Sequence, residues 1–330
     1  MKHRIRTWAS HLFKFSVSVG IIWWLVATDR LELETLRPIL SPSLFLVCFT
    51  LVTVSTLLAS ERWRMLVRAQ NIPGTAFSVF RLTLIGTFFN FAMPGGVGGD
   101  IVKAWYFAKD NPRAKVPAVT SVFLDRVLGL YTMAGMAALA ILVDLDHVMS
   151  GPVLKSLAMI LLPLFFCFTL GLWLIFSRRI HRWGLMARGI DFLPFGEKLI
   201  KVYKTANAFS SHRKTVFGVL LVSFASQCLS IFCLWLVGRA AGFSEVGLWT
   251  YFLVAPIGFM ATAIPISPAG IGVGQAAFYF LFNLYLGKQV TLGPTVITAL
   301  QGLQVLLGLI GALFYLQRKD RVSMETIEAT

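Results

Sequence analysis

Two adjacent charged residues, Asp125 and Arg126, lie well inside the apolar segment that begins near Pro117. Charges at membrane depth are costly, and they usually face a protein interior or a wet cavity. Neighbouring helical residues point about 100° apart, so these two side chains do not simply pair with each other. The sequence offers Asp100 as a partner for Arg126 and Arg81 as a partner for Asp125. We expect such a cluster to hold a lipid phosphate; a purely structural ion-pair network is the alternative.

Lys103 follows Asp100 by one helical turn and could share its carboxylate. Neutral polar residues also occur in apolar stretches, and each of them is expected to form an interhelical hydrogen bond more often than a ligand contact. They are Asn90, Gln227, Gln275, Gln301 and Gln304. The basic runs 61–64 and 177–214 are expected at the membrane surface, where they would attract anionic head groups or simply serve as cytoplasmic loops.

Two glycine-rich breaks interrupt apolar segments. The first reads Met93-Pro94-Gly95-Gly96-Val97-Gly98-Gly99-Asp100, and the second reads Ser267-Pro268-Ala269-Gly270-Ile271-Gly272-Val273-Gly274-Gln275. Proline ends a helix, and glycine permits backbone angles that other residues resist. Irregular backbone at membrane depth lines a cavity or a buried interface, and the helix that restarts there offers amides to an anion. The alternative is that these glycines only allow close helix packing.

The elements that carry these residues are membrane helices. Of all residues 57% are hydrophobic and 14% charged, and the mean hydropathy is +0.75. Apolar runs are long enough to cross a hydrocarbon core about 30 Å thick. We therefore predict an all-α polytopic membrane protein with about six full spans and two opposed broken or re-entrant hairpins related as an inverted repeat. The spans are 11–28, 43–60, 117–143, 153–176, 215–237 and 294–316, and the hairpins are 73–110 and 246–287.

Basic residues predict the topology of this single transmembrane domain, which covers residues 1–330. The formal net charge is +15, and the basic residues concentrate in connections such as 177–214, as the positive-inside bias requires. This distribution argues against nucleic-acid binding. It places both termini in the cytoplasm and makes hairpin 73–110 enter from that side, while 246–287 enters from the opposite one. Residues 11–28 follow a basic start as a signal peptide would, but no small-residue cleavage site follows, so we expect a retained helix.

Several of these residues together resemble the flippase-like membrane family, which is the membrane region of lysylphosphatidylglycerol synthase and also occurs as stand-alone proteins. The resemblance rests on Asn90-x3-Pro94, Gly98-Gly99-Asp100, Asp125-Arg126 with Gly129, and Pro268-x-Gly270-x-Gly272, and it runs from about residue 10 to 316. The family implies lipid translocation. Its larger members carry a soluble aminoacyltransferase domain that this chain lacks, so lysyl transfer is not expected. Gln275 stands where relatives often carry Glu.

The leading functional hypothesis is a flippase that moves a phospholipid or lipid-linked intermediate through a central polar site. The alternatives are a non-catalytic scaffold or regulator of envelope lipid or glycan synthesis, a small-solute transporter and an intramembrane enzyme. Enzymatic activity is not expected, because the histidines lie at helix ends or in loops. No GxxxxGK[ST] motif for ATP occurs, so any transport is expected to be passive, ion-coupled or driven by removal of the substrate. Cysteines at 48, 167, 228 and 233 have no CxxC spacing and are expected to pack as small apolar residues.

The predicted partners are membrane lipids with anionic or phosphate-bearing head groups, and enzymes of lipid or glycan synthesis. No cofactor or metal is expected, and the predicted location is the bacterial cytoplasmic (inner) membrane. The candidate substrate-binding residues are Asn90, Pro94, Gly95, Gly98, Gly99, Asp100, Lys103, Asp125, Arg126, Gly270, Gly272 and Gln275.

Overall fold

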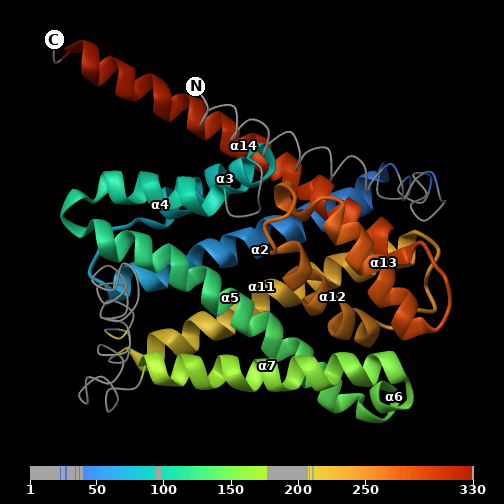
Figure 1. The fold of residues 1–330 in the computed structure, drawn as a ribbon. Coiled ribbons are helices and arrows are strands. Elements are labelled where there is room, and N and C mark those ends of the chain that lie inside the picture. Colours follow the sequence, from blue (N-terminus) through green and yellow to red (C-terminus); the bar gives the residue numbers. More distant parts are fainter. Residues whose placement is uncertain are drawn as a thin grey trace, which may run out of the picture. The chain divides into compact units, whose positions relative to one another are not determined.

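The computed structural model describes residues 40–93, 98–176 and 212–328, with a few isolated positions outside these ranges and side chains up to residue 318. Every regular element in these ranges is a helix (Figure 1). The longer helices are α2 (Pro42–Ala69), α3 (Ala76–Ala92), α4 (Gly98–Asp110), α5 (Lys115–Val143), α7 (Pro152–Phe176), α11 (Arg213–Ala240), α12 (Leu248–Thr262), α13 (Val273–Leu286) and α14 (Leu292–Glu328). Short helices η2 (Pro112–Ala114), α6 (Leu145–Ser150) and η4 (Pro268–Gly270) connect some of them.

Within the described residues, 6 helices are long and apolar enough to cross a membrane. They cover Pro42–Ala69, Pro112–Val143, Pro152–Ile175, Arg213–Ala240, Pro268–Leu286 and Leu292–Arg318. Five of them coincide with predicted spans, and the predicted first span, 11–28, lies outside the described residues. The sixth is the second half of the predicted hairpin 246–287, whose first half, Leu248–Thr262, is a shorter apolar helix. The all-α polytopic architecture expected from hydropathy is confirmed.

The chain forms two compact units. Unit 1 comprises residues 1–57, 80–103 and 227–330, and unit 2 comprises 58–79 and 104–226. The division runs within α2, α3, α4 and α11, so each of these helices contributes residues to both units. Both glycine-rich breaks therefore belong to unit 1, and the Asp125-Arg126 pair belongs to unit 2.

Helices α2 and α11 run antiparallel in each unit. In unit 1 the Cys233 thiol lies 4.0 Å from the Cys48 carbonyl oxygen, and the Ser55 and Ser230 hydroxyls are 3.0 Å apart. In unit 2 the Arg62 guanidinium bonds to Ser223, and a Cβ on Gly218 would touch the Met65 side chain. Residue numbers rise along α2 as they fall along α11, so the Ala69 end of α2 lies beside the Arg213 end of α11.

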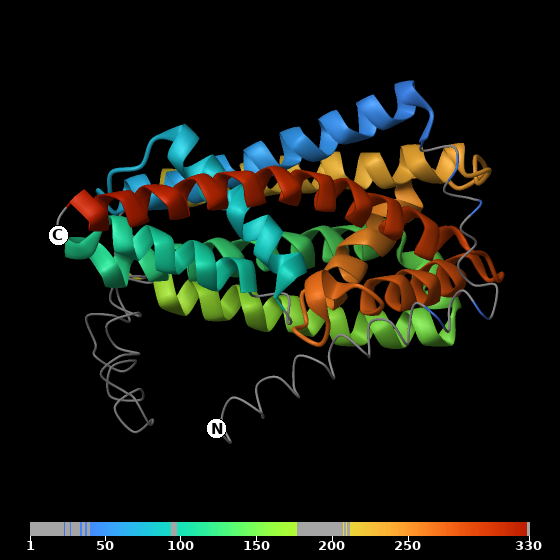
Figure 2. The same ribbon diagram turned by 90° about the horizontal axis from the view of Figure 1, so that it is seen from above.

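The segment between α11 and α14 returns to the end at which it started. A Cβ on Gly238, near the end of α11, would lie 3.0 Å from the Leu292 side chain at the start of α14. The Lys288 ammonium is 3.5 Å from the Glu245 carboxylate. Between these points α12 packs against α13, and α13 packs against α14 (Figure 2). This is the geometry that a helical hairpin over 246–287 requires.

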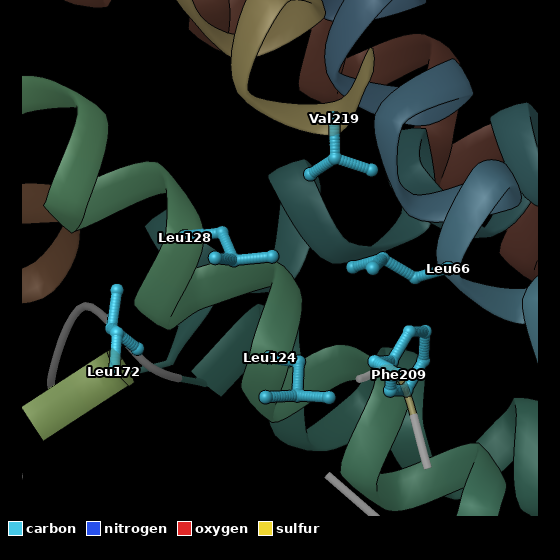
Figure 3. Packing of buried hydrophobic residues seen from close by; sticks show 6 residues of the cluster. All are labelled: Leu66, Leu124, Leu128, Leu172, Phe209 and Val219. Carbon is cyan, nitrogen blue, oxygen red and sulfur yellow. The ribbon is translucent and has the colours of Figure 1, made fainter. Parts of the chain in front are cut away.

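Unit 2 has an apolar core built by several helices. Figure 3 shows the six residues of this core, which come from α2, α5, α7 and α11 and from Phe209, which precedes α11 in the sequence. They are Leu66, Leu124, Leu128, Leu172, Phe209 and Val219. Helix α7 packs on α5 through the rings of Phe165 and Tyr131, whose centroids are 5.3 Å apart. The Thr169 hydroxyl also donates to the Tyr131 hydroxyl at 3.3 Å. These contacts hold α7 against α5.

Candidate functional site

The second break is a left-handed turn between α12 and α13. Its residues Ala269, Gly270 and Gly272 have φ values of 47°, 70° and 85°. Glycine adopts such angles at no steric cost, whereas alanine is strained there. A Cβ on Gly270 would also crowd the Thr262 backbone and side chain at 2.6–2.9 Å. Backbone conformation and close packing against the end of α12 together explain the glycine at position 270.

Gln275 closes this break from inside. Its Oε1 accepts the Gly272 N–H at 2.7 Å, and its Nε2 donates to Gln301 at 2.7 Å and to Thr298 at 3.1 Å. The Gln301 Nε2 in turn donates to the Ala269 carbonyl at 3.2 Å. Gln275 is only 2% exposed. The amide therefore satisfies backbone and side-chain polar groups that would otherwise be costly at membrane depth.

The first break is capped in a comparable way. Asn90 Oδ1, near the end of α3, accepts the Gly99 N–H of α4 at 2.9 Å. A Cβ on Gly99 would overlap the Gly86 carbonyl, so α3 and α4 approach with backbone against backbone. A Cβ on Gly98 would likewise crowd the Met93 side chain. Pro94 and Gly95, also predicted at the site, lie outside the described residues.

Two charged residues follow in α4. Asp100 lies in the first turn of α4, where the positive end of the helix dipole stabilises a carboxylate. Lys103, one turn later, is buried, with 6% of its surface exposed. Both residues belong to unit 1, together with the two breaks.

Helix α14 contacts both hairpins of unit 1. Gln301 bonds to the second break, as described above, while Gly308 lies against the Phe88 backbone of α3. A Cβ on Gly311 would overlap the Leu84 carbonyl of α3. Because Gln301 and Gly311 are about 15 Å apart along the helix axis, the two hairpins meet α14 within about half the thickness of a hydrocarbon core.

A buried ion pair forms the centre of unit 2. Arg62 Nε donates to Asp125 Oδ1 at 2.8 Å, and Arg62 Nη1 donates to the Ser223 hydroxyl at 3.0 Å. The two charged side chains are 14% and 8% exposed, respectively. Gly129, one turn beyond Asp125 on α5, gives the guanidinium room, since a Cβ there would lie 3.0 Å from Nη1. Three helices, α2, α5 and α11, thus meet at one guanidinium.

Arg62 was not among the predicted site residues, and its surroundings show what the run 61–64 contacts within the protein. The run 61–64, which was expected at the membrane surface, is part of α2, which continues to Ala69, and both Arg62 and Trp63 point into unit 2. Trp63 is fully buried, and its indole N–H donates to the Ser121 hydroxyl at 3.1 Å. Glu61 and Arg64 form an ion pair on the same stretch of helix. The available signal was the uninterrupted helical pattern of α2, which contains no proline or glycine between Ser43 and Ala69.

Six of the predicted site residues come together with partners at three places. Asn90 and Gly99 meet at the first break, Gly270, Gly272 and Gln275 meet at the second, and Asp125 meets Arg62 and Ser223. Arg126, beside Asp125 on α5, is half-buried and belongs to unit 2. No cluster of three or more His, Cys, Asp or Glu side chains suited to a metal occurs among the described residues. All four cysteines are free thiols, with Cys48 and Cys233 buried and Cys167 exposed.

Apolar helices of membrane-spanning length, broken hairpins and buried charged side chains define this chain as an integral, polytopic helical membrane protein. A family model described as the lysylphosphatidylglycerol synthase TM region matches residues 11–322, and the chain belongs to that family. Membership makes it a membrane protein of lipid metabolism. Comparisons with curated proteins and with solved structures found no match.

Proposed function

We propose that this protein translocates a lipid with an anionic, phosphate-bearing head group, without catalysing a covalent reaction. The observation that carries the proposal is that α14 contacts both broken hairpins of unit 1, through Gln301 and through Gly308 and Gly311. Membership in a family of lipid metabolism supports a lipid as the substrate.

Broken helices packed against a common helix are the elements that transporters use near the membrane midplane. Closely packed interfaces between such elements switch between discrete arrangements, which allows alternating access. Asp100 and Lys103, just after the first break, supply charge for a polar head group. Arg126 supplies positive charge from α5.

The proposed location is the bacterial cytoplasmic membrane, with both termini in the cytoplasm. The ends of α2, α5 and α11 that carry Arg68, Lys115 and Arg213 support this orientation, since basic residues favour the cytoplasmic side. Enzymes that make the transported lipid or a lipid-linked glycan are the proposed protein partners.

The test is a flip assay in proteoliposomes. Fluorescent phosphatidylglycerol, phosphatidylcholine and a polyprenyl phosphate would be followed by the fraction of label accessible to a membrane-impermeant quencher. Asp100→Asn and Arg126→Gln are expected to abolish flip of the anionic lipid. Asp110→Asn, at the exposed end of the same helix α4, and Arg113→Gln, an exposed residue of η2, are the matched controls and are expected to retain it. Folded wild-type protein that flips none of these lipids would overturn the proposal.

One observation favours the second candidate, a non-transporting scaffold of lipid or glycan synthesis. The polar groups of the second break bond to each other through Gln275 and Gln301, and glycines pack tightly around Thr262. A closely packed, fully hydrogen-bonded break suits a scaffold, whereas a transport site must open to admit its substrate. Absence of flip, together with co-purification of a membrane-bound synthase from crosslinked cells, would favour this candidate.

A further inference from the structure

The Arg62 guanidinium has hydrogen-bonding capacity that its described protein contacts do not use. An arginine side chain carries five N–H donors in a planar fork. Nε bonds to Asp125 and Nη1 bonds to Ser223, whereas the described residues provide no hydrogen-bond acceptor for Nη2. The two bonds fix the plane of the guanidinium, so the direction of the remaining donors is fixed as well.

Leaving these donors without an acceptor is costly, because the side chain is largely buried. Arg62 lies about 10 Å along the helix axis from the end of α2 at Ala69, and its side chain is 14% exposed. An unsatisfied polar group in the hydrocarbon region costs several kcal/mol. The guanidinium is therefore held in place with donors left for an external acceptor.

The charges around Arg62 favour an anionic acceptor. Asp125 is engaged at Nε, and Glu61 on the preceding turn is paired with Arg64. Arg126 stands next to Asp125, and Arg68 and Arg213 occupy the neighbouring helix ends of the same unit. A phosphate oxygen suits a fixed arginine fork better than any neutral group does.

We infer that Arg62 binds the phosphate of an anionic lipid through Nη2, while Asp125 and Ser223 hold its guanidinium in place. This inference rests on the proposed function and names the residue that would recognise the head group from unit 2. It assigns a role to Arg62 that neither the glycine-rich breaks nor the Asp125-Arg126 motif predicts.

The test measures lipid retention rather than transport. Protein in phosphatidylcholine nanodiscs doped with phosphatidylglycerol would be released and its bound lipids counted by native mass spectrometry. Arg62→Gln combined with Asp125→Asn keeps neutral hydrogen-bonding groups of similar size, so it avoids an unpaired buried charge. We expect at least a tenfold loss of phosphatidylglycerol retention in this variant, with phosphatidylcholine retention unchanged. Arg64→Gln is the matched control and should retain phosphatidylglycerol as the wild type does.

Two further arms separate the possible sources of phosphate and the two proposals. Inorganic phosphate and glycerol phosphate are expected not to displace the bound lipid, and displacement at millimolar concentration would overturn the assignment to a lipid. Wild-type retention of phosphatidylglycerol in the folded double variant would also overturn the inference. Arginine-dependent retention in a protein that flips no lipid would support the inference and contradict only the proposed function.

Discussion

The guanidinium of Arg62 and the carboxylate of Asp125 meet at 2.8 Å between α2 and α5, and both side chains are largely buried. They come from helices that are separated in the chain by α3 and α4. A buried charge is tolerated only with its partner, because removal of one member leaves the other uncompensated.

Breaking this pair is expected to destabilise the protein strongly. Asp125→Ala should lower the free energy of unfolding by about 3–5 kcal/mol. Arg62→Leu together with Asp125→Leu should cost clearly less than the sum of the two single changes, because no charge remains buried. Reversible unfolding in detergent micelles measures Asp125→Ala, the two single leucine variants and the double leucine variant. Additive losses of unfolding free energy in the leucine set would show that the two side chains do not depend on each other.

Gly311 is expected to control the approach of α14 to α3. Its Cβ would overlap the Leu84 carbonyl, so Gly311→Ala must push the helices apart and should cost about 1–3 kcal/mol. A Cβ on Gly302 of the same helix would meet no other part of the protein within 4 Å, so Gly302→Ala is the matched control. The control should be neutral or stabilising by up to about 1 kcal/mol, because alanine favours the helix. Equal melting temperatures for the two variants would contradict this packing.

The Gln275–Gln301 bond is expected to stabilise the second break. Gln275→Ala and Gln301→Ala should each cost about 1–3 kcal/mol, because each leaves a buried polar group without its partner. The double variant should lower the free energy of unfolding by less than the sum of the two single variants. Gln304→Ala, one turn further along α14, is the control, and thermal unfolding of the set provides the measurement.

Replacement of Ala269 by glycine is expected to leave the stability of the folded protein unchanged or to raise it. Its φ of 47° strains an alanine, so Ala269→Gly should stabilise the protein by about 1 kcal/mol or be neutral. Ala277→Gly, inside α13, should instead destabilise it by about 1 kcal/mol. If both changes lowered the melting temperature equally, the left-handed turn would not be present in the membrane-embedded protein.

The ends of the helices are expected to be accessible from defined sides of the membrane. In a background without native cysteines, Arg68→Cys and Lys115→Cys should react with an impermeant maleimide from one side only. Glu245→Cys and Lys288→Cys should react from the other side, since the Lys288 ammonium lies 3.5 Å from the Glu245 carboxylate at the ends of one hairpin. Labelling of Arg68→Cys and Lys115→Cys from opposite sides would exclude a re-entrant segment 73–110.

Hydropathy and local backbone chemistry were sufficient to predict the membrane helices and the position of the second break. Long apolar runs predict membrane helices because the hydrocarbon thickness sets their length, and five of the predicted spans match helices of the structure. The Pro and Gly residues near 268–272 predict a break because proline and glycine act on their own backbone. Each of these properties depends on residues that are close together in the chain.

Which polar side chains pair with each other, in contrast, depends on how the helices pack. Nothing in the sequence around Asp125 points to Arg62, and the charged run 61–64 suggested an end to the helix rather than a buried face. The rotation and register of α2 against α5 and α11 decide that Arg62 and Trp63 face inward, as the bonds to Asp125 and Ser121 show. In the same way, the packing of α13 on α14 brings Gln275 to Gln301. Rotation and register follow from the summed fit of many side chains, so only the tertiary structure could reveal these pairs.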